Sequence, residues 1–222
     1  ALQYAREHAP GETILPQERN PDFVPQPPYA EAAAMMTFIN MDGEGLVILP
    51  THRVVHGLAD FAPSSFIEKL QPYFTVEPLA MDDADALTAR LREAQGKTAF
   101  VAVTSAGRYL ITTIPEVAKA ALQEIPARQR DLDIVQLHAL ILEKILGINP
   151  EAIRQQTNVR YVRDAAEAID QVARNEANVA FLMNPVTLDE LREVAFAGEV
   201  MPQKSTDFFP KLLSGLTIYA LD

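Results

Sequence analysis

Two short polar strings in this sequence carry residue types that bind anionic groups. The first, PTHRVVH at 50–56, follows an apolar run and offers Thr51, His52 and Arg53. A guanidinium binds carboxylate or phosphate through paired N–H donors, and a histidine can exchange a proton near neutral pH. We therefore expect Thr51 and Arg53 to bind an anionic ligand, with His52 as its acid or base.

The same string has two other interpretations. His52 and His56 lie four positions apart, so on a strand they would share one face, as two ligands of a metal ion could. A metal site needs further ligands, and no carboxylate follows to supply one, so we predict no metal here. The remaining alternative is a structural turn in which Arg53 forms an ion pair.

The second string is MPQKSTDFFPKLLSGL at 201–216. Lys204, Ser205 and Thr206 place an ammonium and two hydroxyls side by side, and Lys211 follows seven residues later. Together with backbone amides these groups suit a phosphate or a carboxylate. No glycine pattern precedes them, so the string is not a P-loop. The alternative is a well-packed loop that returns the chain to a final strand.

Three further polar residues are expected to have structural roles. Arg160 and Arg163, in the string VRYVRD, could meet an anion at a strand end, but surface ion pairing with Asp164 or Glu167 is the simpler interpretation. Asn184 ends a buried strand and is expected to cap the helix that follows.

Composition excludes several classes of protein. The 222 residues carry a net charge of -11, which argues against general nucleic-acid binding, because phosphate neutralisation needs clustered Lys and Arg. There are no cysteines, so disulfides, thiolate metal sites and a cysteine nucleophile are ruled out. No apolar run approaches the length of a membrane span. These features fit a cytoplasmic protein that has no membrane partner.

The elements that must position the two polar strings alternate along the chain. A buried strand over 32–41 comes first, with a helix as the alternative, and a DGEG turn could join it to the run LVILP as a hairpin. A helix over 63–74, an edge strand over 74–79, a helix over 82–96, a hairpin over 97–114 and a short helix over 115–125 follow. The most convincing helix spans 133–147. Strand, helix, strand, helix and strand then follow over 158–162, 165–176, 178–184, 187–198 and 216–221. This order predicts an α/β (or α+β) fold, a mixed sheet with helices and a C-terminal βαβαβ segment.

The ends of the chain suggest a piece of a longer protein. Residues 1–30 read as the back half of a helix without a cap, followed by a Pro-rich linker arm. We expect 31–222 to form a single α/β domain, with a division into subdomains 31–130 and 131–222 as the alternative. An N-terminal domain of the same protein would then be missing.

Several strings together resemble one bacterial family. LVILPTHRVV, LDIVQLHALILEKILGI, VRYVRD, VAFLMNP and MPQKSTDFFPKLLSGLTIY look like the domain-of-unknown-function family 1015, from about residue 31 to the end. Gln203 and Asp207 stand where that family has Pro and Tyr. The resemblance implies longer members with an upstream GHHR-type motif, similar to one in ParB-like and sulfiredoxin-like proteins, a fold that includes a nucleotide-using free serine kinase. The family has no established activity to carry over, and the cofactor is unknown.

Two classes of function follow from these patterns. In the first, the protein binds a small phosphorylated or other anionic ligand, or a nucleotide, and supports phosphoryl transfer; Arg53, Lys204 and Lys211 then hold the anion. In the second, the chain is a non-catalytic module for structure, regulation or homodimer formation. Convergence of the two polar strings on one cleft would favour the first class.

Overall fold

The computed structural model describes residues 39–41 and 45–211. The chain divides into one unit of 44–210 and another of 1–43 with 211–222, and the fold described here is that of the first unit. The expected helix remnant and arm at 1–30, most of the expected strand at 32–41 and the expected final strand at 216–221 lie outside the described residues. Within the described residues, no helix has the length and apolarity needed to cross a lipid bilayer.

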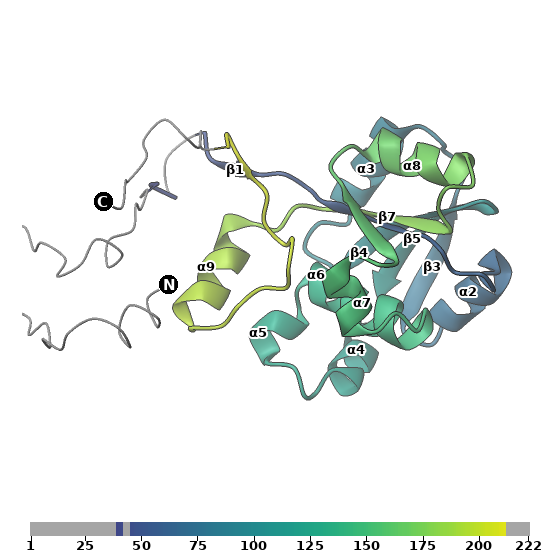
Figure 1. Ribbon diagram of the computed structural model, residues 1–222. Coiled ribbons are helices and arrows are strands. Elements are labelled where there is room, and N and C mark those ends of the chain that lie inside the picture. The colour runs from purple at the N-terminus through teal and green to yellow at the C-terminus, as the bar shows by residue number, and fades with distance from the viewer. Residues whose placement is uncertain (1–38, 42–44, 212–222) are drawn as a thin grey trace, which may run out of the picture. The chain divides into compact units, whose positions relative to one another are not determined.

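A six-stranded sheet forms the centre of this unit, and every pairing in it is antiparallel (Figure 1). Its strand order is β3-β5-β4-β7-β2-β6, and β1 pairs separately with β8. The strands are β1 (Val47–Ile48), β2 (His52–Val55), β3 (Phe74–Leu79), β4 (Ala99–Thr104), β5 (Gly107–Thr113), β6 (Val159–Val162), β7 (Val179–Met183) and β8 (Phe208–Phe209).

Helices cover both faces of the sheet. They are α2 (Pro63–Leu70), α3 (Ala84–Arg92), α4 (Pro115–Ala121), α5 (Ala127–Arg130), α6 (Asp133–Gln136), the π-helix η2 (Leu137–Ile145), α7 (Pro150–Gln155), α8 (Ala165–Ala173) and α9 (Leu188–Phe196). Figure 1 shows α3 and α8 together on one face, with α2, α4, α6 and α7 on the other side of the sheet. The α/β fold class predicted from the sequence is confirmed.

Strand β2 is the element that positions the first polar string. It is fully buried and lies between β6 and β7, antiparallel to both. Successive side chains of a strand point to opposite faces. Val54 accordingly packs in the core beneath α3 and α8, whereas Val55 packs in the core that contains α2 and η2. By the same alternation His52 is on the face of the sheet that contains Val54, and Arg53 is on the face that contains Val55.

Two details differ from the expected architecture. Strands β6 and β7, which α8 connects, run in the same direction, as a βαβ unit requires. Strand β2 lies between them and runs antiparallel to both, so the described sheet has no parallel pair of adjacent strands. The helix expected over 133–147 begins as α6 and continues as the π-helix η2. Its C-terminal bonds include Leu146 N–H to the Ile141 carbonyl at 2.9 Å, five residues back.

Candidate ligand cleft

A cleft of about 780 Å³ opens where several elements end on the Arg53 side of the sheet. Strands β2, β5 and β7, helices α4, α6 and α9, and the loop after α9 all contribute to it. Its polar lining residues are Thr51, Arg53, Gln95, Lys97, Thr98, Thr112, Thr113, Lys119, Asp131, Asp133, Gln136, Asn184, Thr187, Glu190 and Ser205. A concave site with convergent polar groups is where small molecules usually bind.

The Arg53 guanidinium forms the most buried charged part of this cleft, with only 2% of the residue exposed. Its Nη1 donates to the Thr51 carbonyl and lies 3.3 Å from the Met183 sulfur. Its Nη2 donates to the Lys204 carbonyl at 2.9 Å. The guanidinium carbon lies 5.3 Å from the centre of the Tyr161 ring, which is a cation–π distance.

These partners leave the positive charge of Arg53 uncompensated. In the described part of the chain no carboxylate contacts the guanidinium, and its Nε has no hydrogen-bond partner. Burial lowers the pKa of Arg53 to about 10, so the side chain remains charged at neutral pH. Two of its partners are neutral carbonyls, which satisfy N–H donors but supply no counter-charge.

The structure brings part of both polar strings to this cleft. Thr51, Arg53 and the buried Ser205 line it. Lys204 meets Arg53 through its backbone carbonyl, while its side chain is exposed. Thr206 is half-buried and is absent from the described lining. Lys211 is exposed and belongs to the other unit, so its expected contact with the anion stays a prediction.

His52 lies on the opposite face of β2 from Arg53. It is 1% exposed, and its Nδ1 accepts the Met183 backbone N–H at 3.1 Å. Burial, and then the neighbouring Arg53 charge, lower the pKa of His52 to about 4, so the imidazole is neutral at neutral pH. It is absent from the cleft lining. Its role as an acid or base stays a prediction, and the cleft itself contains other titratable groups.

Besides the exposed Asp131, two half-buried carboxyl groups that the sequence did not distinguish line the cleft. They are Asp133, at the start of α6, and Glu190, in the first turn of α9. Burial and then the Glu190 charge raise the pKa of Asp133 to about 7, against a smaller lowering by a Thr98 hydrogen bond. Acids at helix starts are common because they complement the helix dipole, which is why the sequence did not distinguish them.

Two buried polar side chains in the same lining lack partners. Gln136 is 4% exposed; its Nε2 donates to the Arg130 carbonyl at 2.9 Å, but its Oε1 accepts no hydrogen bond from the described residues. The Oγ1 of the buried Thr113 also has no partner among them. Most buried polar atoms are satisfied in native proteins, so these two atoms are exceptions among the residues of the cleft lining.

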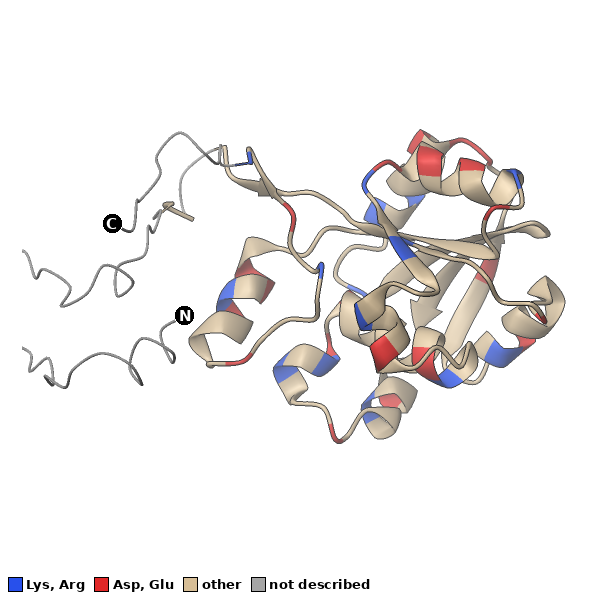
Figure 2. Ribbon diagram, in the orientation of Figure 1, with Lys and Arg blue, Asp and Glu red and all other residues tan. Residues whose placement is uncertain are grey.

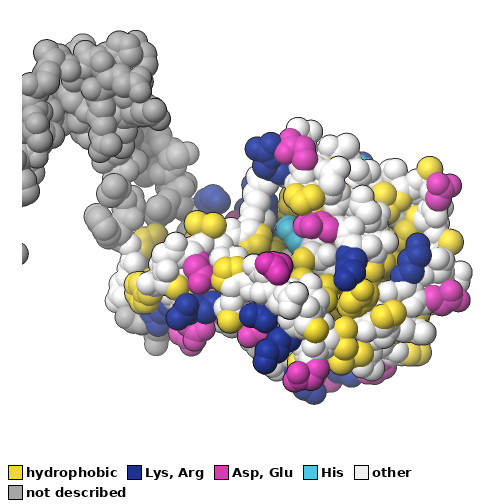
Figure 3. Space-filling model, turned by 90° about the horizontal axis from the view of Figure 1, so that it is seen from below, with side chains coloured by type: hydrophobic (Ala, Val, Ile, Leu, Met, Phe, Trp, Pro, Cys, Tyr) yellow, Lys and Arg dark blue, Asp and Glu magenta, His cyan; other side chains and the backbone are white. Residues whose placement is uncertain are grey.

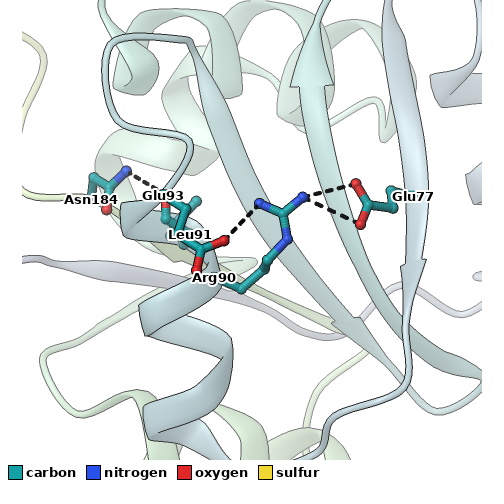
Figure 4. Close-up of polar contacts among 5 residues, drawn as sticks. All are labelled: Glu77, Arg90, Leu91, Glu93 and Asn184. Atoms are coloured by element: carbon teal, nitrogen blue, oxygen red, sulfur yellow. Dashed lines mark hydrogen bonds and ion pairs between the residues drawn. The ribbon is translucent and has the colours of Figure 1, made fainter.

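Asn184 holds the end of β7 in place, although not as the expected cap. Its Nδ2 donates to the Leu91 carbonyl in α3 at 3.3 Å, close to the ion pair of Arg90 with Glu77 (Figure 4). The cap of α9 is instead Thr187, which forms a reciprocal capping box with Glu190. The expected Asn184 cap is therefore wrong, because the chain needs two more residues before the helix begins.

The loop that contains the second string is held by polar contacts at its far end. Arg163 pairs with Asp207 of the loop, with Nη2 to Oδ1 at 2.9 Å, whereas Asp164 caps α8. Leu49 N–H donates to the Asp207 carbonyl at 2.8 Å, next to the β1–β8 ladder. The expected pairing of Arg163 with Asp164 or Glu167 is therefore wrong, since its partner comes from the second string.

Charges on the surface are mixed in sign. Figure 2 shows Asp and Glu distributed over most helices, with Lys and Arg between them. Figure 3 shows the same alternation on the face seen from below, without a broad basic area. Among the described residues, no group of three or more His, Asp or Glu is placed to hold a metal ion. The buried, unpaired Arg53 therefore differs in kind from the solvated charges around it.

The fold and the cleft define an α/β protein with a buried arginine in the wall of a ligand-sized cleft. This chain belongs to the family described as protein of unknown function (DUF1015), whose model matches residues 1–135. The family expected from the sequence is thus confirmed, although the matched residues include the N-terminal part and end before the later strings VRYVRD, VAFLMNP and MPQKST.

Solved structures resemble the chain only distantly. A conserved hypothetical protein from Pyrococcus furiosus has 16% identity and a TM-score of 0.45, over 77% of this chain and 59% of its own. A free serine kinase variant in complex with AMP has 15% identity and a TM-score of 0.43, over 77% and 56%; the complex with ADP has 14% and 0.44, over 78% and 57%. The chain thus spans less than two thirds of the length of these proteins. No curated protein matches it significantly.

Proposed function

We propose that the cleft binds a small anionic ligand, with its phosphate or carboxylate group at Arg53. The observation that carries this proposal is the state of the guanidinium: it is buried, lines the cleft, has an unpaired Nε and contacts no carboxylate of the described chain. Thr51, which lines the cleft beside it, would supply a hydroxyl donor, whereas the hydroxyl of the neighbouring Ser205 already donates to the Pro202 carbonyl.

The energetic argument concerns the cost of an uncompensated buried charge. Moving an ion from water into a protein interior costs roughly several kcal/mol even after the protein relaxes. A fold that retains such an ion needs a favourable interaction that offsets this cost. A phosphate or carboxylate would do so through charge-assisted hydrogen bonds to the guanidinium. The cleft volume of about 780 Å³ also lies within the range that holds a small molecule.

In longer members of the family the same wall would suit a phosphorylated ligand or a nucleotide. Phosphoryl transfer depends mainly on positioning and charge stabilisation, which a rigidly held arginine provides. Lys204 and Thr206 would then contribute from the loop, with the exposed Lys204 ammonium attracting the anion before it reaches Arg53.

Thermal unfolding with and without ligand tests the proposal. Millimolar inorganic phosphate, ethyl phosphate or AMP should raise the melting temperature of the chain, because a ligand that binds only the native state stabilises it. Arg53→Met should abolish the rise. Arg154→Met is the matched control, since Arg154 is exposed and pairs only with its helical neighbour Glu151 in the described contacts.

Two outcomes would overturn the anion site. One is the absence of any shift with all three ligands; the other is an undiminished shift in Arg53→Met. Should Arg53→Met fail to fold, Arg53→Lys replaces it: a lysine keeps the charge but loses the planar fork of donors, so the shift should shrink without vanishing.

A second candidate function is that of a non-catalytic dimerisation or support module. It is favoured by the exposed apolar side chains Phe196, 88% exposed, and Val200, 79% exposed, at and just beyond the end of α9. Under this alternative the melting temperature would not respond to anions but would rise with protein concentration, because association stabilises the native state.

A further inference from the structure

The cleft has a second wall with the opposite chemistry to Arg53. Asp133 and Glu190 line it with carboxyl groups, and Gln136 lines it with a buried side chain whose Oε1 has no partner among the described residues. The side-chain oxygens of these three residues are hydrogen-bond acceptors when the carboxyls are ionised. We call these three residues the acceptor wall.

The oxygens of the acceptor wall have few hydrogen-bond donors among the described residues. Glu190 Oε2 accepts from the Thr187 N–H at 2.7 Å and from its hydroxyl at 2.8 Å, which are contacts of the helix cap. Burial and then the Glu190 charge disfavour the charged form of Asp133, and the nearby Thr98 hydroxyl, which donates to the Asp131 carbonyl at 3.3 Å, offsets them only in part. Like charges close together in a buried setting call for a positive partner.

The other charges of the lining do not supply that partner. Lys97 and Lys119 line the cleft but are exposed, and no described ion pair joins either of them to Asp133 or Glu190. Asp131, the remaining charged residue of the lining apart from Arg53, is exposed and acidic. The buried Arg53 and the half-buried Asp133 and Glu190 therefore line one cleft, and no described ion pair joins the arginine to either acid.

We propose that the acceptor wall binds a protonated amine of the same ligand whose anionic group binds Arg53, so that the cleft takes a ligand with both an ammonium and an anionic group. This inference rests on the proposed function, because Arg53 must hold the anionic end. An ammonium presents three N–H donors and no acceptor, which matches two carboxylates and an amide oxygen. A neutral hydroxyl would leave the repulsion between Asp133 and Glu190 in place.

Calorimetric titration at pH 8 with two probes of similar size tests the inference. Phosphoethanolamine carries a phosphate and an ammonium, whereas ethyl phosphate carries the phosphate alone. We expect phosphoethanolamine to bind about tenfold more tightly, in line with the coupling measured for close charge pairs in partly buried sites. Both Asp133→Asn and Glu190→Gln should bring the two dissociation constants together while retaining ethyl phosphate binding.

The variants are chosen to keep the fold. Glu190→Gln preserves a capping-box residue for α9, and Asp133→Asn preserves shape. Asp131→Asn is the matched control, since it removes an exposed carboxylate from the same lining. Exposed charge pairs contribute little, so the tenfold preference for phosphoethanolamine should stay unchanged within about a factor of two.

The outcomes separate this inference from the proposed function. If neither probe binds, the anion site itself fails and the acceptor wall fails with it. If both bind equally to the unaltered protein, the anion site stands and the ammonium site is overturned. The ammonium site would also be overturned if added Mg²⁺ made ethyl phosphate bind more tightly and Asp133→Asn removed that gain. The acceptor wall would then hold a metal ion instead of an ammonium.

Discussion

The two walls of the cleft bury charges of opposite sign, and the fold supports them in different ways. Arg53 belongs to β2, which is hydrogen-bonded on both sides, and its guanidinium donates to the carbonyl of the nearby Thr51 and to that of the distant Lys204. Asp133 opens a helix of four residues, and burial and the Glu190 charge both act against its charged form. One wall is rigid, and the other is held mainly by local structure.

This difference also separates a permanent charge from a switchable one. With a pKa of about 10, Arg53 stays protonated throughout the neutral range. Asp133, with a pKa raised to about 7, is partly protonated at the same pH. A group whose pKa lies near the operating pH is suited to proton exchange. The comparison therefore predicts constant anion binding at one wall and pH-dependent cation binding at the other.

The largest effect is expected where the rigid wall is anchored. His52→Ala removes a fully buried ring and leaves the Met183 N–H without its acceptor, so the free energy of unfolding should fall by about 2–4 kcal/mol. Urea unfolding followed by circular dichroism measures it. His56→Ala is the control: that half-buried side chain makes no described hydrogen bond and should cost less than half as much. Equal losses in both variants would mean that His52 does not anchor β2.

The next effect tests the switchable wall through the pH dependence of stability. Because the folded pKa of Asp133 lies above its unfolded value of 3.8, the folded state binds more protons between pH 4 and 7, and ionisation costs stability above that window. Asp133→Asn removes this cost, so it should stabilise the protein by about 1–3 kcal/mol at pH 8. At pH 4, where the carboxyl is protonated anyway, the two proteins should differ little.

Melting curves of both proteins at pH 4, 6 and 8 would measure this difference. Asp170→Asn, a change of an exposed acid on α8, is the control and should show no such rise with pH. A stabilisation by Asp133→Asn that is the same at all three pH values would contradict the raised pKa and would make the acceptor wall as fixed as the arginine wall.

Much of the fold could be predicted from local sequence patterns. The hairpin of β4 and β5, the edge position of β3 and the helix–strand alternation after residue 158 follow from periodicity and punctuation. The insertion of β2 between β6 and β7 could not, because that pairing joins segments far apart in sequence. The π-helix was also hidden, since over nine residues its apolar pattern differs little from that of an α-helix.

The site was predictable only in part. An arginine directly after an apolar run was a visible signal, and Arg53 does line a cleft with Ser205 of the second string. The contact between the strings uses the carbonyl of Lys204, which a sequence pattern does not specify. Asp133 and Glu190 resembled ordinary helix-start acids, and only the fold reveals that they face the same cleft.

The smallest expected effect concerns Lys204, which contributes its backbone to the rigid wall. Its φ of 60° is left-handed and its carbonyl accepts from Arg53, but its ammonium is exposed. Lys204→Ala keeps the carbonyl and loses only a solvated charge, so phosphate affinity should fall about two- to threefold, typical of an exposed pair, with unfolding unchanged. Calorimetry with inorganic phosphate measures the affinity. A loss as complete as in Arg53→Met would place the ammonium on the ligand and make the rigid wall a two-cation site.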